Sequence, residues 1–560
     1  MTGPASADTY YDLGSHHRSV DTTSPDAQVW FNRGLIWSYA FNHDEAIRCF
    51  ERALECDADL GLAHWGIAYA VGPNYNKAWD AFDPDDLAYS LHRAHTELDL
   101  AEGARTNAVE RELISALRQR FPTDDPADVE ALTAGHSAYA DAMVVLAATH
   151  PDDLDVATLA ADALLNVTAW QLWDGATGEP AAGSRVVEAT RILDTVLGSP
   201  AGHTHPGALH LYLHAMEMSA TPESALRAAD RLRGLVPDAG HLQHMPSHID
   251  VLCGNYHDSI SANLLAVHAD RKFVAQEGAA NFYTLYRAHD LHFVVYSAMF
   301  EANSAVALAA AEELAQQLTP ELLAITSPPM ADWLEAFVPL GIHVLIRFGR
   351  WQELITQPTP TDPDLFATTA ATVHYGRGIA YAATGDLPRA RAEREAFVDR
   401  YQRIPPTRYL FNNSCHDILA IARSMLDGEI AYREGNFDKA FENLRAAVEL
   451  DDQLPYDEPW GWMQPTRHAY GALLLEQGQV EQAAAVYAAD LGLDPSVNRS
   501  NHHPNNVWSL HGYHECLVRL GRTSEADLIG RQLQLAKARA DVPIDASCAC
   551  RLSTTGGCCS

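Results

Sequence analysis

Hydrophobic residues recur at intervals of three and four positions along most of the chain, with polar residues between them. This spacing places the hydrophobic side chains on one face of an α-helix, where a neighbouring element can cover them. Alternating hydrophobic and polar runs, which are typical of strands, are scarce, whereas the helix formers alanine, leucine and glutamate are abundant. The pattern therefore predicts an all-α protein built of successive amphipathic helices.

A regular exchange of small and large residues groups these helices into pairs. After Trp30, small residues stand at Gly34, Ala46 and Ala53, and further large residues stand at Trp37 and Phe50. Small residues let two helices approach closely, and large ones fill the space between neighbouring pairs. The pattern is typical of helix–turn–helix repeats of about 34 residues.

The same pattern returns in the C-terminal half, at Gly378, Gly428 and Gly471, with weaker copies near Gly341 and Gly512. The middle of the chain is helical but fits the pattern poorly. Stacked units of this kind bury a continuous core between neighbours. We therefore predict a right-handed solenoid of helix–turn–helix repeats, and an array of this length can close around an internal pocket.

The regularity of the pattern divides the chain into five segments. They are a flexible N-terminal segment (1–27), N-terminal repeats (28–100), divergent helical repeats (101–330), C-terminal repeats (331–535) and a flexible cysteine-rich tail (536–560).

The composition limits the classes of partner that the protein could bind and indicates where in the cell we expect it. The formal net charge is −35, from 74 acidic and 39 basic residues, which disfavours nucleic acid and anionic membranes as partners. The first residues form no secretory signal, and no run of 18 apolar residues suggests a membrane span; we expect a cytoplasmic protein. Gly-rich phosphate loops, a dinucleotide fingerprint and a GxSxG element are missing, so nucleotide and serine-hydrolase chemistry lack support.

Several longer motifs resemble one subgroup of the tetratricopeptide-repeat family. They are FNHDEA at 41–46, WGIAYAVGPNYN at 65–76, HPGALHLYLHAMEMS at 205–219, AGHLQHMPSHI at 239–249 and AHDLHF at 288–293. The subgroup is the one that includes tetratricopeptide repeat protein thirty-eight. The resemblance implies the helical-repeat architecture and marks the histidine segments as important, but it assigns no general reaction. The cysteine-rich tail is not part of the pattern.

Histidines concentrate in these motifs. Seven lie between residues 201 and 248, and two more follow in AHDLHF; they are His203, His205, His210, His214, His241, His244, His248, His289 and His292. Histidine is the commonest metal ligand in proteins. Such a density within a helical protein is the strongest indication of function in this sequence.

The spacing predicts that several of these rings converge. His210 and His214 are four residues apart in a proline-free stretch, so they share one helix face, and Glu217 follows on that face. Pro246 fits the first turn of a further helix, which places His244 and His248 about one turn apart.

His241 would lie on the approach to that second helix, and His289 and His292 could join from the next helix along. Three or four neutral imidazoles suit copper, iron or zinc. A catalytic site would keep one coordination position open for water or dioxygen, with Glu217, or less suitably Glu301, as a carboxylate ligand or general base.

Structural explanations exist for the same residues. Buried histidines often serve only as hydrogen-bonding groups between helices, so a structural or substrate-binding polar pocket stays open as an alternative. Asn42, His43, Asn74 and Asn76 are weaker candidates for the site, because turn chemistry explains much of their motifs.

The tail carries a second chemical signal. Cys548 and Cys550 form a Cys-x-Cys element, and Cys558 and Cys559 are adjacent. Soft thiolates favour thiophilic metals, so the tail could deliver a metal, sense a thiophilic species or form a redox disulfide. Disulfide geometry favours pairing between the two elements over pairing of adjacent cysteines.

Three functions follow from these observations. The first is a metal-dependent enzyme, an oxidoreductase or hydrolase acting on a small molecule at the histidine site. The second is a repeat scaffold that binds a protein or peptide partner in its groove. The third is a metal-handling or thiol-sensing protein that uses the cysteine-rich tail.

Overall fold

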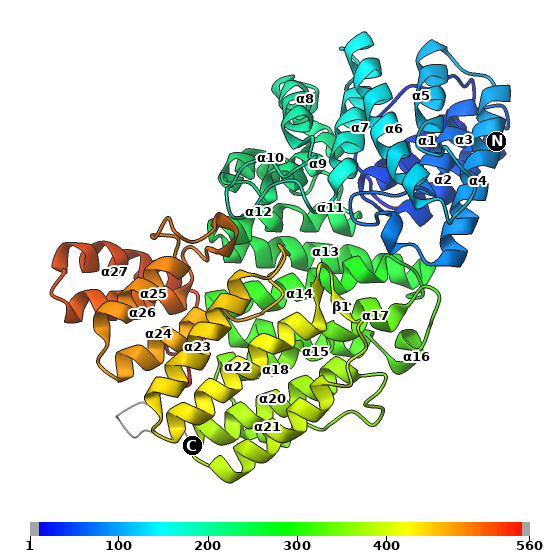
Figure 1. Ribbon diagram of the computed structural model, residues 1–560. Helices are drawn as coiled ribbons and strands as arrows, with labels where there is room; N and C mark the ends of the chain where they lie inside the picture. Colours follow the sequence, from blue (N-terminus) through cyan, green and yellow to red (C-terminus); the bar gives the residue numbers. More distant parts are fainter. Residues whose placement is uncertain (1–9, 552–560) are drawn as a thin grey trace, which may run out of the picture. The chain divides into compact units, whose positions relative to one another are not determined.

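The computed structural model describes residues 10–551, and they form two compact units (Figure 1). The first unit contains the chain up to Ile249 together with Leu265–Gly278, and the second contains Asp250–Leu264 together with the chain from Ala279 onward. The prediction of an all-α fold is confirmed. Among the described residues the strands are limited to one short antiparallel ribbon, β1 (Tyr409–Leu410) and β2 (Asn413–Ser414).

The first unit consists of α1 (Pro25–Tyr39), α2 (His43–Cys56), α3 (Gly61–Ala70), η1 (Trp79–Ala81), α4 (Pro84–Gly103), α5 (Ala108–Arg118), α6 (Val129–Thr149), α7 (Leu154–Leu165), η2 (Asn166–Thr168), α8 (Val186–Gly198), η3 (Gly202–Thr204), α9 (Pro206–Glu217), η4 (Pro222–Ala225), α10 (Leu226–Leu232) and α11 (Gly240–His244). Two helices, α12 (Pro246–Cys253) and α13 (Tyr256–Glu277), have residues in both units.

The second unit consists of α14 (Thr284–Glu301), α15 (Ser304–Gln317), α16 (Pro320–Leu323), α17 (Met330–Leu334), η5 (Glu335–Phe337), α18 (Leu340–Arg347), α19 (Trp351–Thr356), α20 (Ala367–Ala383), α21 (Leu387–Tyr401), the ribbon, α22 (Cys415–Arg433), α23 (Phe437–Asp452), α24 (Thr466–Glu476), α25 (Val480–Asp490), η6 (Arg499–Asn501), α26 (Val507–Arg519) and α27 (Thr523–Lys537).

The first helix pair shows why the small and large residues alternate. The Phe50 side chain of α2 lies between α1 and α3. A Cβ atom at Gly34 of α1 would stand 2.6 Å from the Phe50 ring, and one at Gly66 of α3 would stand 2.7 Å from it. Only glycine leaves room for the fully buried ring at these two positions.

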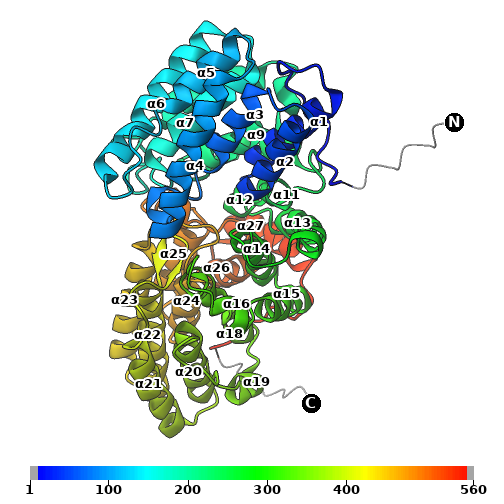
Figure 2. The same cartoon turned by 90° about the vertical axis from the view of Figure 1, so that its right-hand side faces the viewer.

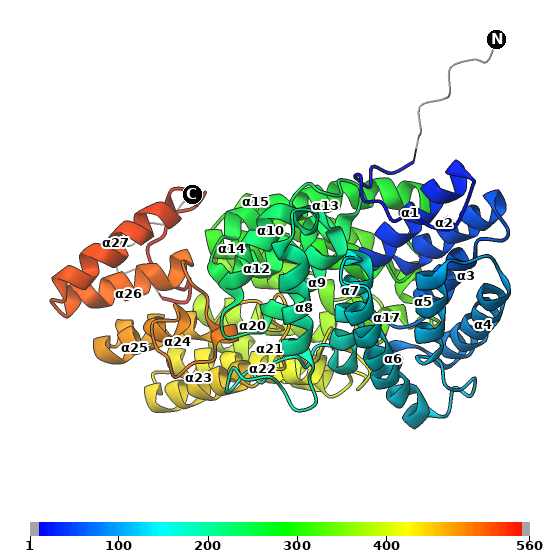
Figure 3. The same ribbon diagram turned by 90° about the horizontal axis from the view of Figure 1, so that it is seen from above.

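The C-terminal pairs repeat this arrangement. Tyr487 of α25 lies between Gly471 of α24 and Gly512 of α26, again at distances that exclude a Cβ atom. The predicted repeat glycines Gly378 and Gly428 lie in α20 and α22, the first helices of their pairs. Figure 2 shows α20 to α23 side by side, and Figure 3 shows α26 beside α27.

Polar side chains fix where the first helices begin. Ser24 precedes α1, and its side chain accepts a hydrogen bond from the Ala27 N–H, with Pro25 at the first helical position. Asn42 precedes α2 in the same role and accepts from the Glu45 N–H. The FNHDEA motif therefore forms the turn within a helix pair, as turn chemistry predicted.

The two segments predicted to be flexible differ from that prediction where they are described. Tyr11, Leu13 and Val20 are buried in the first unit, and Ile544 and Cys550 are buried in the second. These segments lack helical periodicity, yet they pack by single apolar side chains. Residues 1–9 and 552–560, which include Cys558 and Cys559, lie outside the described residues.

Between residues 10 and 551 we find no helix that is both long and apolar enough to cross a lipid bilayer.

Candidate metal centre

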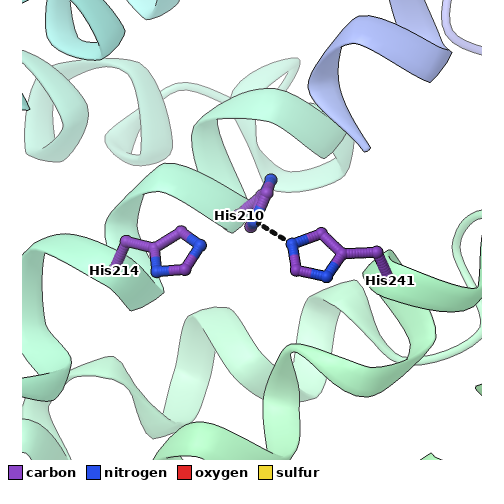
Figure 4. Close-up of side chains that lie close together, drawn as sticks. All are labelled: His210, His214 and His241. Atoms are coloured by element: carbon purple, nitrogen blue, oxygen red, sulfur yellow. Dashed lines mark hydrogen bonds between the residues drawn. The ribbon is translucent and has the colours of Figure 1, made fainter. Parts of the chain in front are cut away.

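Helices α9 and α11 bring three histidines together in the first unit. Pro206 occupies the first position of α9, and its N-cap residue His205 accepts the Ala208 N–H through Nδ1 at 3.2 Å. Figure 4 shows His210 and His214 of α9 and His241 of α11 pointing toward one another. Each offers a ring nitrogen within 4.8 Å of the other two. We call these three residues the histidine centre.

The centre continues into a second, adjacent group of side chains. His244 of α11 and His248 of α12 lie with their Nε2 atoms 2.8 Å apart. Glu217, at the end of α9, links the two groups through hydrogen bonds to His214 and His248. The five histidines and Glu217 are no more than 1% exposed.

Hydrogen bonds decide which nitrogen of each ring carries the proton. The Nδ1 atom of His210 lies 2.6 Å from the carbonyl oxygen of Tyr39. A carbonyl oxygen only accepts, so Nδ1 is protonated and donates, and the Nε2 atom of His210 keeps its lone pair. The Nε2–H of His241 donates to that lone pair across 3.1 Å.

Glu217 fixes the same tautomer, with the proton on Nδ1, in two further rings. As a carboxylate it accepts from Nδ1 of His214 at 3.0 Å and from Nδ1 of His248 at 2.8 Å. Both rings then keep a lone pair at Nε2. The Nε2 atom of His214 is buried and has no hydrogen-bond partner among residues 10–551. Donation of the second ring nitrogen to a carboxylate or carbonyl is the usual support of a metal-ligating histidine.

Burial keeps the three rings of the centre neutral. Loss of water lowers the pKa of His210, His214 and His241 well below the usual value, and the neighbouring imidazoles act in the same direction. Burial raises the pKa of Glu217, which the contact with His248 opposes. Neutral imidazoles are the form that binds metals.

Two aromatic rings surround the histidine centre, and both come from motifs that resemble the tetratricopeptide-repeat subgroup. The Phe41 ring lies 4.5 Å from the ring of His210, and 5.7 and 5.6 Å from those of His214 and His241, measured between centroids. Phe41 has a φ of +55°, a conformation that bulky residues rarely adopt. Tyr75 packs 4.6 Å from His214. Sequence reasoning missed both rings, although both stand in motifs that it had singled out.

The remaining polar residues of those motifs have turn and packing roles. His43 donates through Nδ1 to the Ala70 carbonyl at 2.8 Å. The Asn74 side chain accepts from the backbone N–H groups of Asn76 and Lys77, each at 2.9 Å. These bonds hold a turn and join the start of α2 to the end of α3, and none of them involves the three histidines of the centre.

Other predicted site residues lie in the second unit. His289 and His292 are in α14, where His289 packs edge-on against Phe411 and His292 lies 2.9 Å from the sulfur of Met463. Their participation in the histidine centre stays a prediction. Glu301 also belongs to this unit and pairs with His257 at 3.2 Å.

A second cluster of titratable groups in the first unit was missed by the sequence analysis. Asp155 accepts from Nε2 of His16 at 2.9 Å, from Nε2 of His205 at 3.2 Å and from the Tyr39 hydroxyl at 2.7 Å. Burial opposes ionisation of Asp155, but these donors outweigh it and hold its pKa well below the usual value. Because His205 accepts at Nδ1, its Nε2 carries the proton, which leaves no lone pair for a metal.

Both oxygens of Glu217 accept hydrogen bonds from imidazoles, an arrangement that suits a residue that orients the two rings. Its predicted role as a carboxylate ligand or general base stays a prediction. Cys548 differs from prediction, since it pairs with Cys550 in a disulfide of 2.30 Å rather than with the Cys-Cys element. Neither sulfur is then a thiolate.

Comparison with known proteins identifies the first helix pair. Residues 27–60, which span α1 and α2, match the family profile of the tetratricopeptide repeat. The chain carries a tetratricopeptide repeat. The predicted repeat type is therefore confirmed for residues 27–60, and the subgroup stays a prediction. The first unit of this helical protein encloses the histidine centre.

Other similarities are short or distant. The protein bimA of Emericella nidulans is 36% identical over 75 residues, which is 13% of this chain and 9% of that protein. A monomeric mutant of IFIT1 with Gppp-AAAA is 12% identical, over 91% of this chain and 99% of that one, with a TM-score of 0.32. Yeast Tom70 is 11% identical, over 91% of this chain and 92% of that one, with a TM-score of 0.27. The structure of Naa15/Naa10 bound to HypK-THB is 13% identical, over 92% of this chain and 72% of that one, with a TM-score of 0.22. At these scores the three structures carry no argument about function.

Proposed function

We propose that this tetratricopeptide-repeat protein binds one transition-metal ion at the histidine centre. The observation that carries the proposal is the orientation of His210 and His214. The Tyr39 carbonyl and Glu217 hold the proton of each ring at Nδ1, and both Nε2 lone pairs face the same buried space. His241 is the third ligand, and binding shifts its proton away from Nε2.

The donor set fits copper, iron or zinc. Neutral imidazoles suit these ions, and zinc–nitrogen bonds are about 2.0–2.1 Å long. The three nitrogens, now within 4.8 Å of one another, must therefore approach on binding. Three protein ligands would leave a position for water or dioxygen, which is the basis for proposing oxidative or hydrolytic chemistry at the same site.

A purely structural network explains the centre less well. A structural network would satisfy its buried polar atoms, because an unsatisfied one costs about 1–3 kcal/mol. The Nε2 atom of His214 has no hydrogen-bond partner within the described part of the chain, whereas the Nδ1 atom of the same ring donates to Glu217. A metal ion would supply the missing partner.

Elemental analysis of the purified full-length protein tests the proposal. After expression in metal-replete medium we expect about one transition-metal ion per chain, and its loss in a His210→Asn, His214→Asn variant that keeps its helical circular dichroism. A His203→Asn variant is the matched control, because His203 lies in η3 outside the centre. Wild-type protein with no more metal than the double variant would refute the site.

The tetratricopeptide repeat favours a second function, the binding of a protein or peptide partner. Solenoids of paired helices present extended concave surfaces to such partners. This function does not depend on the metal. We expect a partner captured by the full-length protein to be captured equally by the His210→Asn, His214→Asn variant. A partner lost with the metal would tie the two functions together.

A further inference from the structure

The end of the described chain lies along the first helices of the C-terminal pairs. We call residues 541–551 the tail segment. It contacts Arg347 of α18, Arg433 of α22 and His468 of α24, and it ends against Glu515 of α26. One non-helical segment, which ends in a turn closed by the Arg551 N–H and the Cys548 carbonyl, therefore touches four separate helices of the second unit.

Two arginines hold the tail segment by its backbone. Arg347 donates through Nη1 to the carbonyl oxygen of Ser547 at 3.0 Å, and Arg433 donates to the carbonyl oxygen of Cys550. Arg347 is itself 5% exposed, so this guanidinium is built into the fold. Because backbone carbonyls are present in every peptide, these two hydrogen bonds do not depend on the sequence of the bound segment.

Ser547 adds a side-chain requirement at the same place. Its hydroxyl donates to the His468 carbonyl at 3.2 Å and bonds the Tyr487 hydroxyl. Ser547 is 1% exposed, so a larger side chain would not fit without displacing α24 or α25. Among small residues, only one with a hydroxyl makes both contacts.

Charged residues anchor the two ends. Asp541 accepts from the N–H groups of Ser304 and Ala305 at 2.7 and 2.8 Å, at the start of α15. Arg551 pairs with both oxygens of Glu515 at 2.5 and 2.9 Å, a two-point geometry that is specific for arginine. The order of anchors defines a motif, a serine followed four positions later by an arginine.

The tail segment does not fill the groove in which it lies. Cys548 and Cys550 border a cavity of about 40 Å³ that is also lined by Trp351, Tyr375 and Trp462. A ligand with a larger apolar side chain in place of Cys548 or Cys550 would reach into it.

We propose that this face of the second unit is a binding site for a non-helical peptide segment with a serine and, four positions later, an arginine, and that the tail segment occupies it as an intramolecular ligand. The proposal rests on the partner-binding function proposed above and is independent of the metal centre. A partner segment with the same anchors would have to displace residues 541–551. The chain's net charge of −35 favours such a basic-ended peptide.

Because the tail segment is part of the same chain, its effective concentration determines how strongly it competes with a free peptide. A short flexible tether gives an effective concentration of about 1 mM. A free peptide that binds the empty groove with a dissociation constant of about 10 μM would therefore bind the occupied groove about 100-fold more weakly.

Peptide binding to the full-length protein tests the proposal. The probe is a fluorescent peptide with the sequence of residues 541–551 and its Cys548–Cys550 disulfide formed, followed by anisotropy. We compare wild type with a Ser547→Arg, Arg551→Glu variant, in which the tail segment loses its fit but the groove is unchanged. The variant should bind about 100-fold more tightly than wild type. A control peptide that carries the same two substitutions should not bind.

Several outcomes would overturn the proposal. One is a variant that melts like wild type but binds the peptide no better. Another is dimerisation of wild type by light scattering, with the tail segments exchanged between copies. If the double substitution prevents folding, Arg551→Glu alone, at the partly exposed end, provides the comparison with a smaller gain. Failure here leaves the capture of partners by the histidine variants unaffected, so the two proposals fail separately.

Discussion

Substitution of Glu217 by glutamine separates a metal centre from a structural network. The glutamine side chain has the same shape, but it offers one oxygen and one NH₂ group in place of two acceptor oxygens. It can accept from His214 or from His248, not from both. The ring that faces the NH₂ group must accept at Nδ1, which moves its proton to Nε2 and removes the lone pair.

The expected loss follows from this change in proton position. Replacement of a carboxylate that orients a metal-ligating histidine typically lowers metal affinity by about 10- to 100-fold, which corresponds to about 1.4–2.7 kcal/mol. Both hydrogen bonds remain possible in the metal-free protein after the tautomer change. The free energy of unfolding should therefore fall by no more than about 1 kcal/mol.

Competition with a chromophoric chelator measures the affinity, and urea unfolding of the metal-free protein measures stability. Glu301→Gln is the matched control, because Glu301 is a buried carboxylate that pairs with a histidine in the other unit. Unchanged metal affinity in both Glu217→Gln and Glu217→Ala, the second of which removes the side-chain acceptor of His214 whichever way the amide is turned, would refute the orientation argument. So would a large loss of stability with no loss of affinity, since that is the behaviour of a structural bond.

Three further perturbations test the packing and the electrostatics. Phe41→Ala removes the ring that covers the histidine centre and should lower the free energy of unfolding in urea by about 3–5 kcal/mol; a change below 1 kcal/mol would contradict its position. Gly66→Ala places a methyl group 2.7 Å from the Phe50 ring and should cost about 1–3 kcal/mol, partly restored by Phe50→Leu in the same chain. Burial lowers the pKa of His343 to about 4, so its unfolded form binds more protons between pH 6.5 and 4, and stability falls as pH falls through that window. His343→Gln should reduce the loss between pH 7.5 and 4.5 by about 2.5 kcal/mol, and an unchanged pH profile would show that His343 is not buried as a neutral ring.

The helix pairs were predictable because a local pattern determines them. Phe50 needs small residues on both neighbouring helices, and the sequence shows Gly34 and Gly66 at the required spacing. The common face of His210 and His214 was predictable for the same reason, since four residues make one helical turn. These are short-range consequences of helix geometry.

The rest of the site depends on contacts between distant segments. Periodicity cannot show that the Tyr39 carbonyl meets His210, or that Asp155 draws His16 and His205 into a separate cluster. Phe41 stands in the FNHDEA turn motif, and only the structure places it against three imidazoles. The tail segment was missed because a non-helical stretch leaves no helical period in the sequence.

The ring nitrogens distinguish the two histidine clusters of the first unit. His205 accepts a backbone N–H at Nδ1 and therefore donates at Nε2. His210 donates at Nδ1 and keeps the Nε2 lone pair. The hydrogen-bond partner of Nδ1 thus determines the role of each histidine. His205 caps the start of a helix, whereas His210 keeps a lone pair that could bind a metal.

X-ray absorption spectroscopy of the metal-loaded, full-length protein tests the central claim most directly. The account predicts a first shell that includes three imidazole nitrogens at about 2.0–2.1 Å for zinc, with the multiple-scattering signature of the rings. The His210→Asn, His214→Asn variant should lose that signature. A sulfur shell, or a spectrum without imidazole scattering in the wild type, would contradict a metal centre formed by His210, His214 and His241.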